Sequence, residues 1–290
     1  MVNYKEKFAE AKTIAVNEGF ESTRAEWLFL DVFGWSKTDY LIHKDEQMSL
    51  TSINKLDKAL DRMVTGEPIQ YIVGFQSFYG YQYKVNQHCL IPRPETEEVM
   101  LHFLELCKKT DTIADIGTGS GAIAITLKLL QPELNVIATD LYEDALNVIA
   151  TDLYEDALNV AKQNASHYHQ NIQFLRGNAL KPLIENDIKL DGLISNPPYI
   201  GHSEIIDMES TVLNYEPHHA LFAEKNGFAI YESILEDLPF VMKQGGHVVF
   251  EIGYSQGDIL KGMIQDLYPE KEVEIFKDIN GNQRIISIIW

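Results

Sequence analysis

Cysteine is scarce in this sequence, with only Cys89 and Cys107 among 290 residues. These two residues form neither a metal-ligand spacing nor a disulfide framework, which excludes zinc-binding and disulfide-stapled classes of protein. We therefore expect no metal site. A reducing compartment such as the cytoplasm suits a chain of this kind.

Long apolar runs are absent as well. No stretch approaches the roughly 20 apolar residues that a membrane-spanning helix needs. The first residues, MVNYKEKFAEAK, are charged and lack the apolar core of a secretory signal peptide. We expect a cytoplasmic protein without membrane association, and nothing in the sequence demands more than a monomer.

Basic residues are few, because 24 Lys and Arg stand against 43 Asp and Glu, for a net charge of -19. A surface of this sign repels phosphate backbones, since nucleic-acid binding depends on clustered Lys and Arg. We therefore expect no direct nucleic-acid partner, and a basic protein fits the charge better.

A perfect tandem repeat lies in the middle of the chain, where NVIATDLYEDAL occurs at residues 135–146 and again at 147–158. Each copy begins with an apolar run that predicts a strand ending on an aspartate, Asp140 or Asp152. Only one copy can occupy the inner strand position. Upstream spacing supports the first copy, while the normal length of the helix and loop that follow supports the second. We expect the second copy to form the strand.

The first part of the chain has the composition of a helical bundle. Leu, Ala, Lys and Glu dominate residues 1–73, and β-branched residues are few. Capping boxes are predicted at Thr23 with Glu26 and at Ser36 with Asp39. We expect a small helical domain here.

The pattern changes after this domain. Residues 74–92 contain FQSFYGYQYKV, whose aromatic residues and central glycine predict a β-hairpin linker. Residues 93–290 alternate apolar runs with helical stretches, which predicts a doubly wound, mostly parallel α/β sheet. The last two apolar runs are joined by KDINGNQ, whose Asn-Gly predicts an antiparallel hairpin. This ending is typical of class I S-adenosylmethionine-dependent methyltransferases and not of ordinary dinucleotide folds.

A glycine-rich loop, DIGTGSG, follows the first strand of the predicted sheet and opens a helix. Its glycines let the backbone approach a ligand and present N–H groups at a helix N-terminus. The glycine spacing also fits a dinucleotide fingerprint. However, a carboxylate before the first glycine repels pyrophosphate and suits the ammonium end of S-adenosylmethionine. The predicted cofactor-binding residues of this loop are Asp115, Gly117, Thr118, Gly119, Ser120 and Gly121.

The strand after this loop is expected to end on an acidic residue that accepts hydrogen bonds from both ribose hydroxyls of the cofactor. The repeat supplies two candidates, Asp140 and Asp152, because each closes an identical NVIATD run. With the second copy as the strand, Asp152 takes this role.

The motif Asn196-Pro197-Pro198-Tyr199 follows the apolar run LDGLIS, at the carboxyl end of a predicted strand. Its two prolines make the segment rigid and non-helical. The Asn196 and Pro197 carbonyls are suited to accept both hydrogens of a planar amino or amide group, and Tyr199 to stack on its face. Such a nitrogen is a poor nucleophile, so holding it against fixed acceptors favours its methylation. We predict these four residues as the catalytic group.

A third motif, IPRPETE, precedes the catalytic domain. Its prolines fix an extended segment, and Glu97 and Glu98 are expected to begin a helix. The motif fits either a plain linker or a lid over the methyl-donor pocket. The residues of the predicted lid are Arg93, Pro94, Glu95 and Thr96.

Together these motifs resemble the protein-(glutamine-N5) methyltransferases of the HemK type, which modify peptide chain release factors. The resemblance covers nearly the whole chain and includes GEPIQYIVG, FYG, IPRPETE, DIGTGSGAIAI, SNPPYI, YEPHHAL, GGHVVFEIG and the strand of Arg284. NPPY alone is shared with adenine-N6 methyltransferases of DNA and RNA. IPRPETE, YEP and the helical N-terminal domain make the match specific.

The resemblance implies methyl transfer from S-adenosyl-L-methionine to the glutamine amide in a release factor's Gly-Gly-Gln motif, leaving S-adenosyl-L-homocysteine. It implies that Asn196 and the Pro197 carbonyl hold the amide, that Tyr199 packs on it, and that the helical domain helps to dock the release factor. It also implies that Asn178 and Ala179 flank the adenine, where many relatives carry Asp and a bulky aromatic residue.

Two other functions fit part of the pattern. An adenine-N6 nucleic-acid methyltransferase shares the glycine loop and NPPY, but the charge of -19 and the lack of any Lys/Arg stretch disfavour it. A non-catalytic S-adenosylmethionine-binding protein fits if the duplicated dodecamer disrupts the site. Asp115 and the NPPY motif both disfavour an NAD-dependent enzyme.

Overall fold

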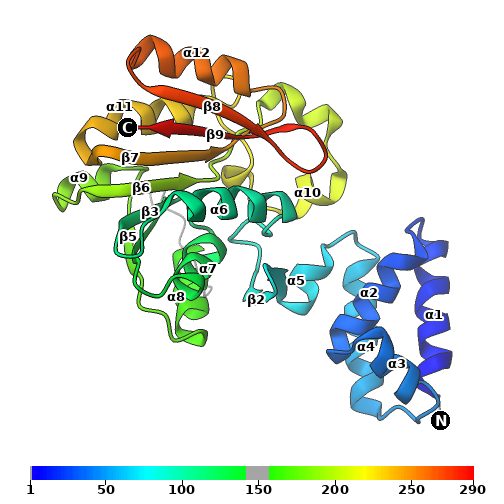
Figure 1. Ribbon diagram of the computed structural model, residues 1–290. Coiled ribbons are helices and arrows are strands. Elements are labelled where there is room, and N and C mark those ends of the chain that lie inside the picture. The colour runs from blue at the N-terminus through cyan, green and yellow to red at the C-terminus, as the bar shows by residue number, and fades with distance from the viewer. Residues whose placement is uncertain (1, 142–156) are drawn as a thin grey trace, which may run out of the picture. The chain divides into compact units, whose positions relative to one another are not determined.

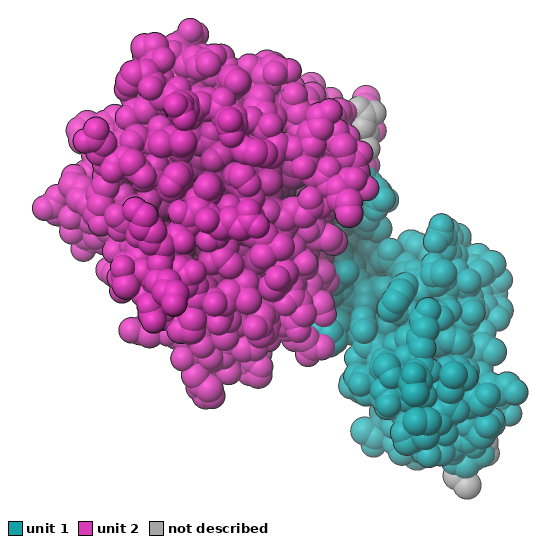
Figure 2. Space-filling view, in the orientation of Figure 1, with its two compact units in different colours: residues 1–75, 209–215 teal, residues 76–208, 216–290 magenta. Residues whose placement is uncertain are grey.

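The computed structural model describes residues 2–141 and 157–290, which form two compact units (Figure 2). Unit 1 extends to Phe75 and includes residues 209–215, while unit 2 contains residues 76–208 and 216–290. The sequence did not indicate that a segment from the middle of the expected catalytic domain groups with the helical unit.

Unit 1 is a bundle of helices, with α10 contributed by the later segment. The helices are α1 (Tyr4–Asn17), α2 (Ser22–Phe33), α3 (Lys37–His43), α4 (Leu50–Met63), α5 (Ile69–Val73) and α10 (Ser210–Tyr215). Helix α4 buries Leu56, Leu60 and Met63 on one face, as their spacing predicts. The Tyr215 hydroxyl donates a 2.7 Å hydrogen bond to the Thr65 carbonyl, which attaches α10 to the turn after α4.

Two expected helix starts in unit 1 have different outcomes. The Ser36–Asp39 capping box is confirmed at the start of α3, with both reciprocal hydrogen bonds formed. The box at Thr23 is wrong, because α2 already begins at Ser22 and its N-cap, Glu21, makes no side-chain cap. Thr23 therefore lies inside the helix, where its hydroxyl donates to Glu21.

Unit 2 is built on a seven-stranded sheet with the order β5-β4-β3-β6-β7-β9-β8 (Figure 1). The first five of these are mutually parallel, and β9 runs antiparallel to both β7 and β8. This confirms the doubly wound sheet with a terminal antiparallel hairpin. The strands are β3 (Thr112–Ile116), β4 (Asn135–Asp140), β5 (Gln173–Arg176), β6 (Leu190–Ser195), β7 (Met242–Glu251), β8 (Glu272–Lys277) and β9 (Gln283–Ile289).

Helices cover both faces of this sheet, which makes three layers. One face carries α6 (Pro94–Leu106), α7 (Ala122–Leu130) and α8 (Ala157–His167), and the other carries α9 (Lys181–Glu185), α11 (Ala229–Val241) and α12 (Gly257–Leu267). Strand residues alternate between the two cores, as the period of a strand requires: Val249 packs with the first set of helices, Val248 and Phe250 with the second. Two short 3₁₀ helices, η1 (His202–Asp207) and η2 (His218–Ala220), complete the unit.

The predicted hairpin linker is present as β1 (Phe75–Phe78) and β2 (Tyr81–Lys84). Its two turn residues, Tyr79 and Gly80, have φ angles of 48° and 79°. Positive φ at both positions is what a type I′ hairpin turn requires. Tyr83 of β2 packs into the core between the sheet and α7, and the hairpin from residue 76 onward belongs to unit 2.

The inner strand β4 (Asn135–Asp140) comes from the first copy of the repeat, which overturns our expectation that the second copy forms it. Helix α7 ends at Leu130, so only residues 131–134 separate it from β4. The Asn135 N–H donates to the Asp111 carbonyl at 2.9 Å, and strand pairing with β3 begins at once. A short connection therefore selects the nearer copy. Asp152 of the second copy lies outside the described residues.

Candidate active site

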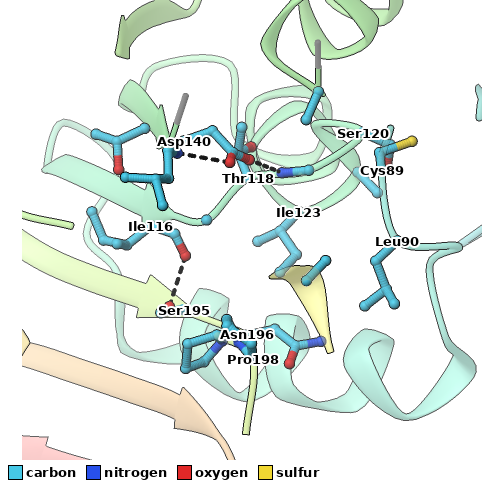
Figure 3. Close-up of a pocket in the computed structure, with 18 of the residues that line it drawn as sticks. Cys89, Leu90, Ile116, Thr118, Ser120, Ile123, Asp140, Ser195, Asn196 and Pro198 are labelled. Atoms are coloured by element: carbon cyan, nitrogen blue, oxygen red, sulfur yellow. Dashed lines mark hydrogen bonds between the residues drawn. The ribbon is translucent and has the colours of Figure 1, made fainter. Parts of the chain in front are cut away.

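The candidate site lies at the carboxyl ends of β3 and β6, which are neighbours in the sheet. The chain proceeds from β3 through β4 to β5 on one side and returns to β6 on the other, so the strand order reverses here. Such a reversal is where open α/β sheets bind ligands. The Ser195 hydroxyl donates a 2.7 Å hydrogen bond to the Ile116 carbonyl and joins the two strand ends (Figure 3).

The glycine loop after β3 forms one wall of a cavity at this point. Gly117 and Gly119 have φ angles of 74° and 55°, which favour glycine, and a Cβ at either position would meet nothing within 4 Å. The loop backbone is thus open toward the cavity, as predicted. The N–H groups of Gly117 and Thr118 both donate to the Thr139 carbonyl at 2.9 Å, which fastens the loop to β4.

Two residues of the predicted loop set do not line the cavity. Asp115 is fully buried, and its Oδ2 accepts hydrogen bonds from the Thr118 hydroxyl at 2.7 Å and the Ala124 N–H at 3.2 Å. Burial raises the pKa of Asp115 to about 7, and its Oδ1 has no hydrogen-bond partner among the described residues. A Cβ on Gly121 would lie 3.1 Å from Ala161 Cβ, so this glycine permits close packing of α8. Contact between Asp115 and the cofactor stays a prediction.

Asp140 lies at the end of β4 and lines the cavity. Its Oδ2 accepts a 2.7 Å hydrogen bond from the Gly119 N–H, and its Oδ1 accepts one from the Leu141 N–H at 2.8 Å. The carboxylate is therefore held against the glycine loop, on the side of the cavity opposite Asn196 (Figure 3). The ribose role predicted for Asp140 or Asp152 stays a prediction.

The NPPY segment leaves β6 with three of its residues, Asn196, Pro197 and Pro198, lining the cavity. The Asn196 side-chain NH₂ donates to the Thr96 hydroxyl at 3.2 Å. Tyr199 is not among the lining residues. Its ring packs against the core that contains residues of α9, α11 and α12, and burial raises the pKa of its hydroxyl. The predicted stacking of Tyr199 on a substrate is untested.

Close packing fixes the backbone of this segment. The Gln256 side-chain NH₂ donates a 2.7 Å hydrogen bond to the Tyr199 carbonyl. Gly227, with a φ of 89°, approaches so closely that a Cβ there would lie 2.0 Å from the Tyr199 carbonyl oxygen. The segment is therefore held rigid from behind, which preorganises its carbonyls.

The IPRPETE segment brings Arg93 and Thr96 to the cavity wall, whereas Pro94 and Glu95 are not among the lining residues. Arg93 forms an ion pair with Glu216, a buried residue of the YEP sequence. Helix α6 begins at Pro94, so the expected start at Glu97 is wrong: proline suits the first helical position, where its missing N–H costs nothing. The predicted lid function is untested.

Asn178 and Ala179, which the resemblance assigned to the adenine, both line the cavity. Ala179 has a φ of 47°, an uncommon value for a residue with a side chain. The Thr139 hydroxyl donates to the Ala179 carbonyl at 3.4 Å and holds this turn near β4.

Sequence reasoning missed several lining residues. The apolar walls include Cys89, Leu90, Ile123 and Ile230, and His219 lies near them. YEPHHAL carried a signal for His219, but the apolar residues have no local pattern that marks a ligand. Burial raises the pKa of the Cys89 thiol to about 12, so this cysteine is a neutral wall residue at physiological pH.

Within residues 2–141 and 157–290, no group of three or more His, Cys, Asp or Glu side chains is arranged to hold a metal ion. None of the helices in the described part of the chain has the length and apolar character needed to span a bilayer.

Comparison with known proteins gives matches over both units. Residues 7–74 match the family described as PrmC N-terminal domain, and residues 96–224 match the Methyltransferase small domain. Two solved structures share the fold. One is a methyltransferase from Pyrococcus furiosus, with a TM-score of 0.51 and 17% identity, covering 80% of this chain and 98% of that one. The other is the hMettl16 catalytic domain, with a TM-score of 0.52 and 13% identity, covering 72% of this chain and 75% of that one; at these identities both show the fold alone.

Curated relatives share much higher sequence identity with this chain than these solved structures do. The release factor glutamine methyltransferase of Staphylococcus aureus (strain NCTC 8325 / PS 47) is 57% identical over 290 residues, covering 100% of both chains. That of Enterococcus faecalis (strain ATCC 700802 / V583) is 41% identical over 286 residues, covering 98% of this chain and 96% of its own. With identity this high over its full length, the chain belongs to the release factor glutamine methyltransferase family.

Proposed function

We propose that this chain transfers a methyl group from S-adenosyl-L-methionine to the side-chain amide nitrogen (N5) of the glutamine in the Gly-Gly-Gln motif of peptide chain release factors. The observation that carries the proposal is that Asn196, Pro197 and Pro198 line the same cavity as the glycine loop, at the reversal of strand order. Membership of the release factor glutamine methyltransferase family supports the substrate.

The lining residues fit S-adenosyl-L-methionine. Open space above Gly117 and Gly119 leaves room for a ligand against the loop backbone. The Asp140 carboxylate supplies acceptors for ribose hydroxyls, and Asn178 supplies a polar group where an adenine edge needs one. When bound, this cofactor supplies an electrophilic methyl group.

The NPPY residues act on the acceptor amide. The Asn196 Oδ1 and the Pro197 carbonyl oxygen accept the two amide hydrogens, which fixes the plane of the group and turns one face of its nitrogen into the cavity. These acceptors also stabilise the positive charge that develops as the nitrogen is methylated. The nitrogen then loses one proton to water, so no dedicated general base is required.

The charge of the chain agrees with a protein partner. A net charge of -19 favours a basic protein over a phosphate backbone, and we propose release factors as the partners and no direct nucleic-acid substrate. We further propose that the protein acts as a monomer in the cytoplasm, where release factors meet ribosomes.

The test is mass spectrometry of a release factor after incubation with the protein and isotopically labelled S-adenosyl-L-methionine. We expect one labelled methyl group on the glutamine of the Gly-Gly-Gln peptide. A release factor carrying Gly-Gly-Glu is the matched negative control, since it lacks only the amide. RNA and DNA are offered in parallel reactions. Label in nucleic acid with none in the release factor would refute the proposal.

Asn196→Ala separates catalysis from cofactor binding. Loss of one fixed transition-state acceptor is expected to lower kcat about 100-fold, by analogy with an oxyanion-hole donor. The dissociation constant of S-adenosyl-L-homocysteine, measured by calorimetry, is expected to stay unchanged. Gln265→Ala, at an exposed position of α12, is the control and is expected to change neither. Equal losses of turnover and cofactor affinity in Asn196→Ala would contradict the assigned role.

A further inference from the structure

A buried chain of polar groups extends from Asn196 away from the cavity. The Asn196 NH₂ donates to the Thr96 hydroxyl at 3.2 Å, and that hydroxyl donates to Glu251 Oε2 at 2.6 Å. Thr96 is 4% exposed and Glu251, the last residue of β7, is 2% exposed. Glu251 does not line the cavity, so direct contact with a ligand does not explain a carboxylate at this position.

The direction of these hydrogen bonds follows from proton counting. A threonine hydroxyl has one hydrogen, and an ionised carboxylate can only accept. With its hydrogen committed to Glu251, the Thr96 oxygen can only accept from Asn196. The asparagine must therefore turn its NH₂ toward Thr96, which leaves its Oδ1 on the opposite side of the amide.

We propose that Glu251, acting through Thr96, is a positioning residue that fixes the amide orientation of Asn196 so that Oδ1 faces the acceptor glutamine. The inference rests on the proposed function, since only an NH₂ acceptor substrate needs an oxygen at this position. In the opposite orientation, the asparagine NH₂ would face the substrate NH₂, and two donors would oppose each other.

The charged and titratable groups around Glu251 come from four elements. Arg284 on β9 supplies a positive charge, Tyr199 after β6 supplies a hydrogen bond, and Glu95 on α6 supplies a negative charge. Tyr231 on α11 donates its hydroxyl to the Glu251 backbone carbonyl at 2.7 Å. Burial outweighs the favourable contacts and raises the pKa of Glu251 to about 7.

Protonation of Glu251 would reverse the direction of the hydrogen bonds that join Glu251, Thr96 and Asn196. A protonated carboxyl can donate to Thr96, whose hydroxyl hydrogen is then free to point at Asn196. The asparagine amide would then flip to present Oδ1 to Thr96 and NH₂ to the substrate. The group is charged above its pKa, so the productive orientation is expected above about pH 7 and is lost as the pH falls below it.

The test compares Thr96→Val with Thr126→Val. Both threonines are buried and both hydroxyls make a 2.6 Å hydrogen bond, but Thr126 pairs with Tyr83 away from the cavity. We expect Thr96→Val to lower kcat roughly tenfold, or about 1.4 kcal/mol of transition-state stabilisation, and Thr96→Ser to restore it. The Thr126→Val variant is expected to lose stability and keep its kcat.

Two readouts separate positioning from a structural role. The wild-type kcat is expected to rise with pH through about 7, and Glu251→Gln is expected to abolish that rise. The side-chain NH₂ resonances of Asn196, in protein labelled with ¹⁵N-asparagine and assigned through Asn196→Asp, are expected to shift with the same midpoint and to lose the shift in Glu251→Gln.

The resonance measurement needs no substrate, so it distinguishes failure of this inference from failure of the proposed function. Wild-type protein that shows the titration but methylates no release factor would overturn the function and keep the positioning role. Asn196 resonances that are insensitive to pH, or equal kcat losses in Thr96→Val and Thr126→Val, would overturn the positioning role itself.

Discussion

Asp115 carries a stability penalty that an isosteric substitution can remove. Its carboxylate is fully buried, and one of its oxygens lacks a hydrogen-bond partner among the described residues. Asp115→Asn keeps the acceptor that holds Thr118 and Ala124, and it replaces the charge with a neutral amide. We expect this variant to be more stable than the wild type at pH 8 and no more stable at pH 5.

The sign and size follow from proton linkage. The pKa of Asp115 is raised from 3.8 to about 7, so between these values the native state holds a proton that the unfolded chain has released. The unfolding free energy therefore falls as the pH rises through this window, by on the order of 4 kcal/mol at 1.36 kcal/mol per pKa unit. The new amide NH₂ lacks an acceptor, which costs about 1–3 kcal/mol. A net gain of roughly 1–3 kcal/mol remains above pH 7.

Urea unfolding across this pH range measures the effect in unit 2 alone. Trp27 and Trp35 lie in unit 1, so replacing both with Phe leaves Trp290, which packs edge-on against Tyr268 at 4.8 Å, as the fluorescence reporter. The stability curves of the wild type and the variant are expected to cross. The same exchange at exposed Asp266 is the control and is expected to give parallel curves. Parallel curves for Asp115→Asn would refute the reasoning.

Three further substitutions test the site. Gly227→Ala places a Cβ against the Tyr199 carbonyl and forces a positive φ on alanine, so kcat is expected to fall about tenfold or more. A normal kcat would show that catalysis does not require the NPPY backbone to be held in place. Ser195→Ala removes the donor to the buried Ile116 carbonyl and is expected to lower the urea unfolding free energy by about 1–3 kcal/mol; no loss would mean that water replaces the hydroxyl. Asp140→Ala is expected to weaken S-adenosyl-L-homocysteine binding at least tenfold by calorimetry, and an unchanged Kd would remove this carboxylate from the cofactor site.

Strands were predicted from sequence more reliably than helix starts. Buried parallel strands are short continuous apolar runs, so TIADI and LDGLIS identified β3 and β6 at their full lengths. Helix starts depend on which of several capping residues is used. Thr23 and Glu97 both resemble good first-turn residues, yet α2 and α6 begin earlier, at Ser22 and Pro94.

The motif residues that line the site were predictable, while the contacts between distant residues that hold them in place were not. Motif positions at strand ends identified Asn196 and gave Asp140 as one of two candidates, with Asp152 expected, because carboxyl ends of parallel strands meet at one edge. Thr96 is 100 residues from Asn196 and 155 from Glu251, and no local pattern connects such positions. Their contact depends on the sheet order, which places β7 beside β6. Asp115 is a different case, since its position suggested a ligand contact, the structure buries its carboxylate in the loop, and the contact itself stays a prediction.

The structure bears on which copy of the tandem repeat is the insertion. The first copy supplies β4 through Asp140, while α8 is described from Ala157, within the second copy. Removing either dodecamer leaves an identical sequence, in which the four residues LYED would join β4 to α8. Four residues is an ordinary length for a strand-to-helix connection. Neither whole copy can be named as the insertion, because the two are identical and the first supplies β4 while the second supplies described residues of α8. The additional twelve residues lengthen the stretch between Asp140 and Ala157 from four residues to sixteen.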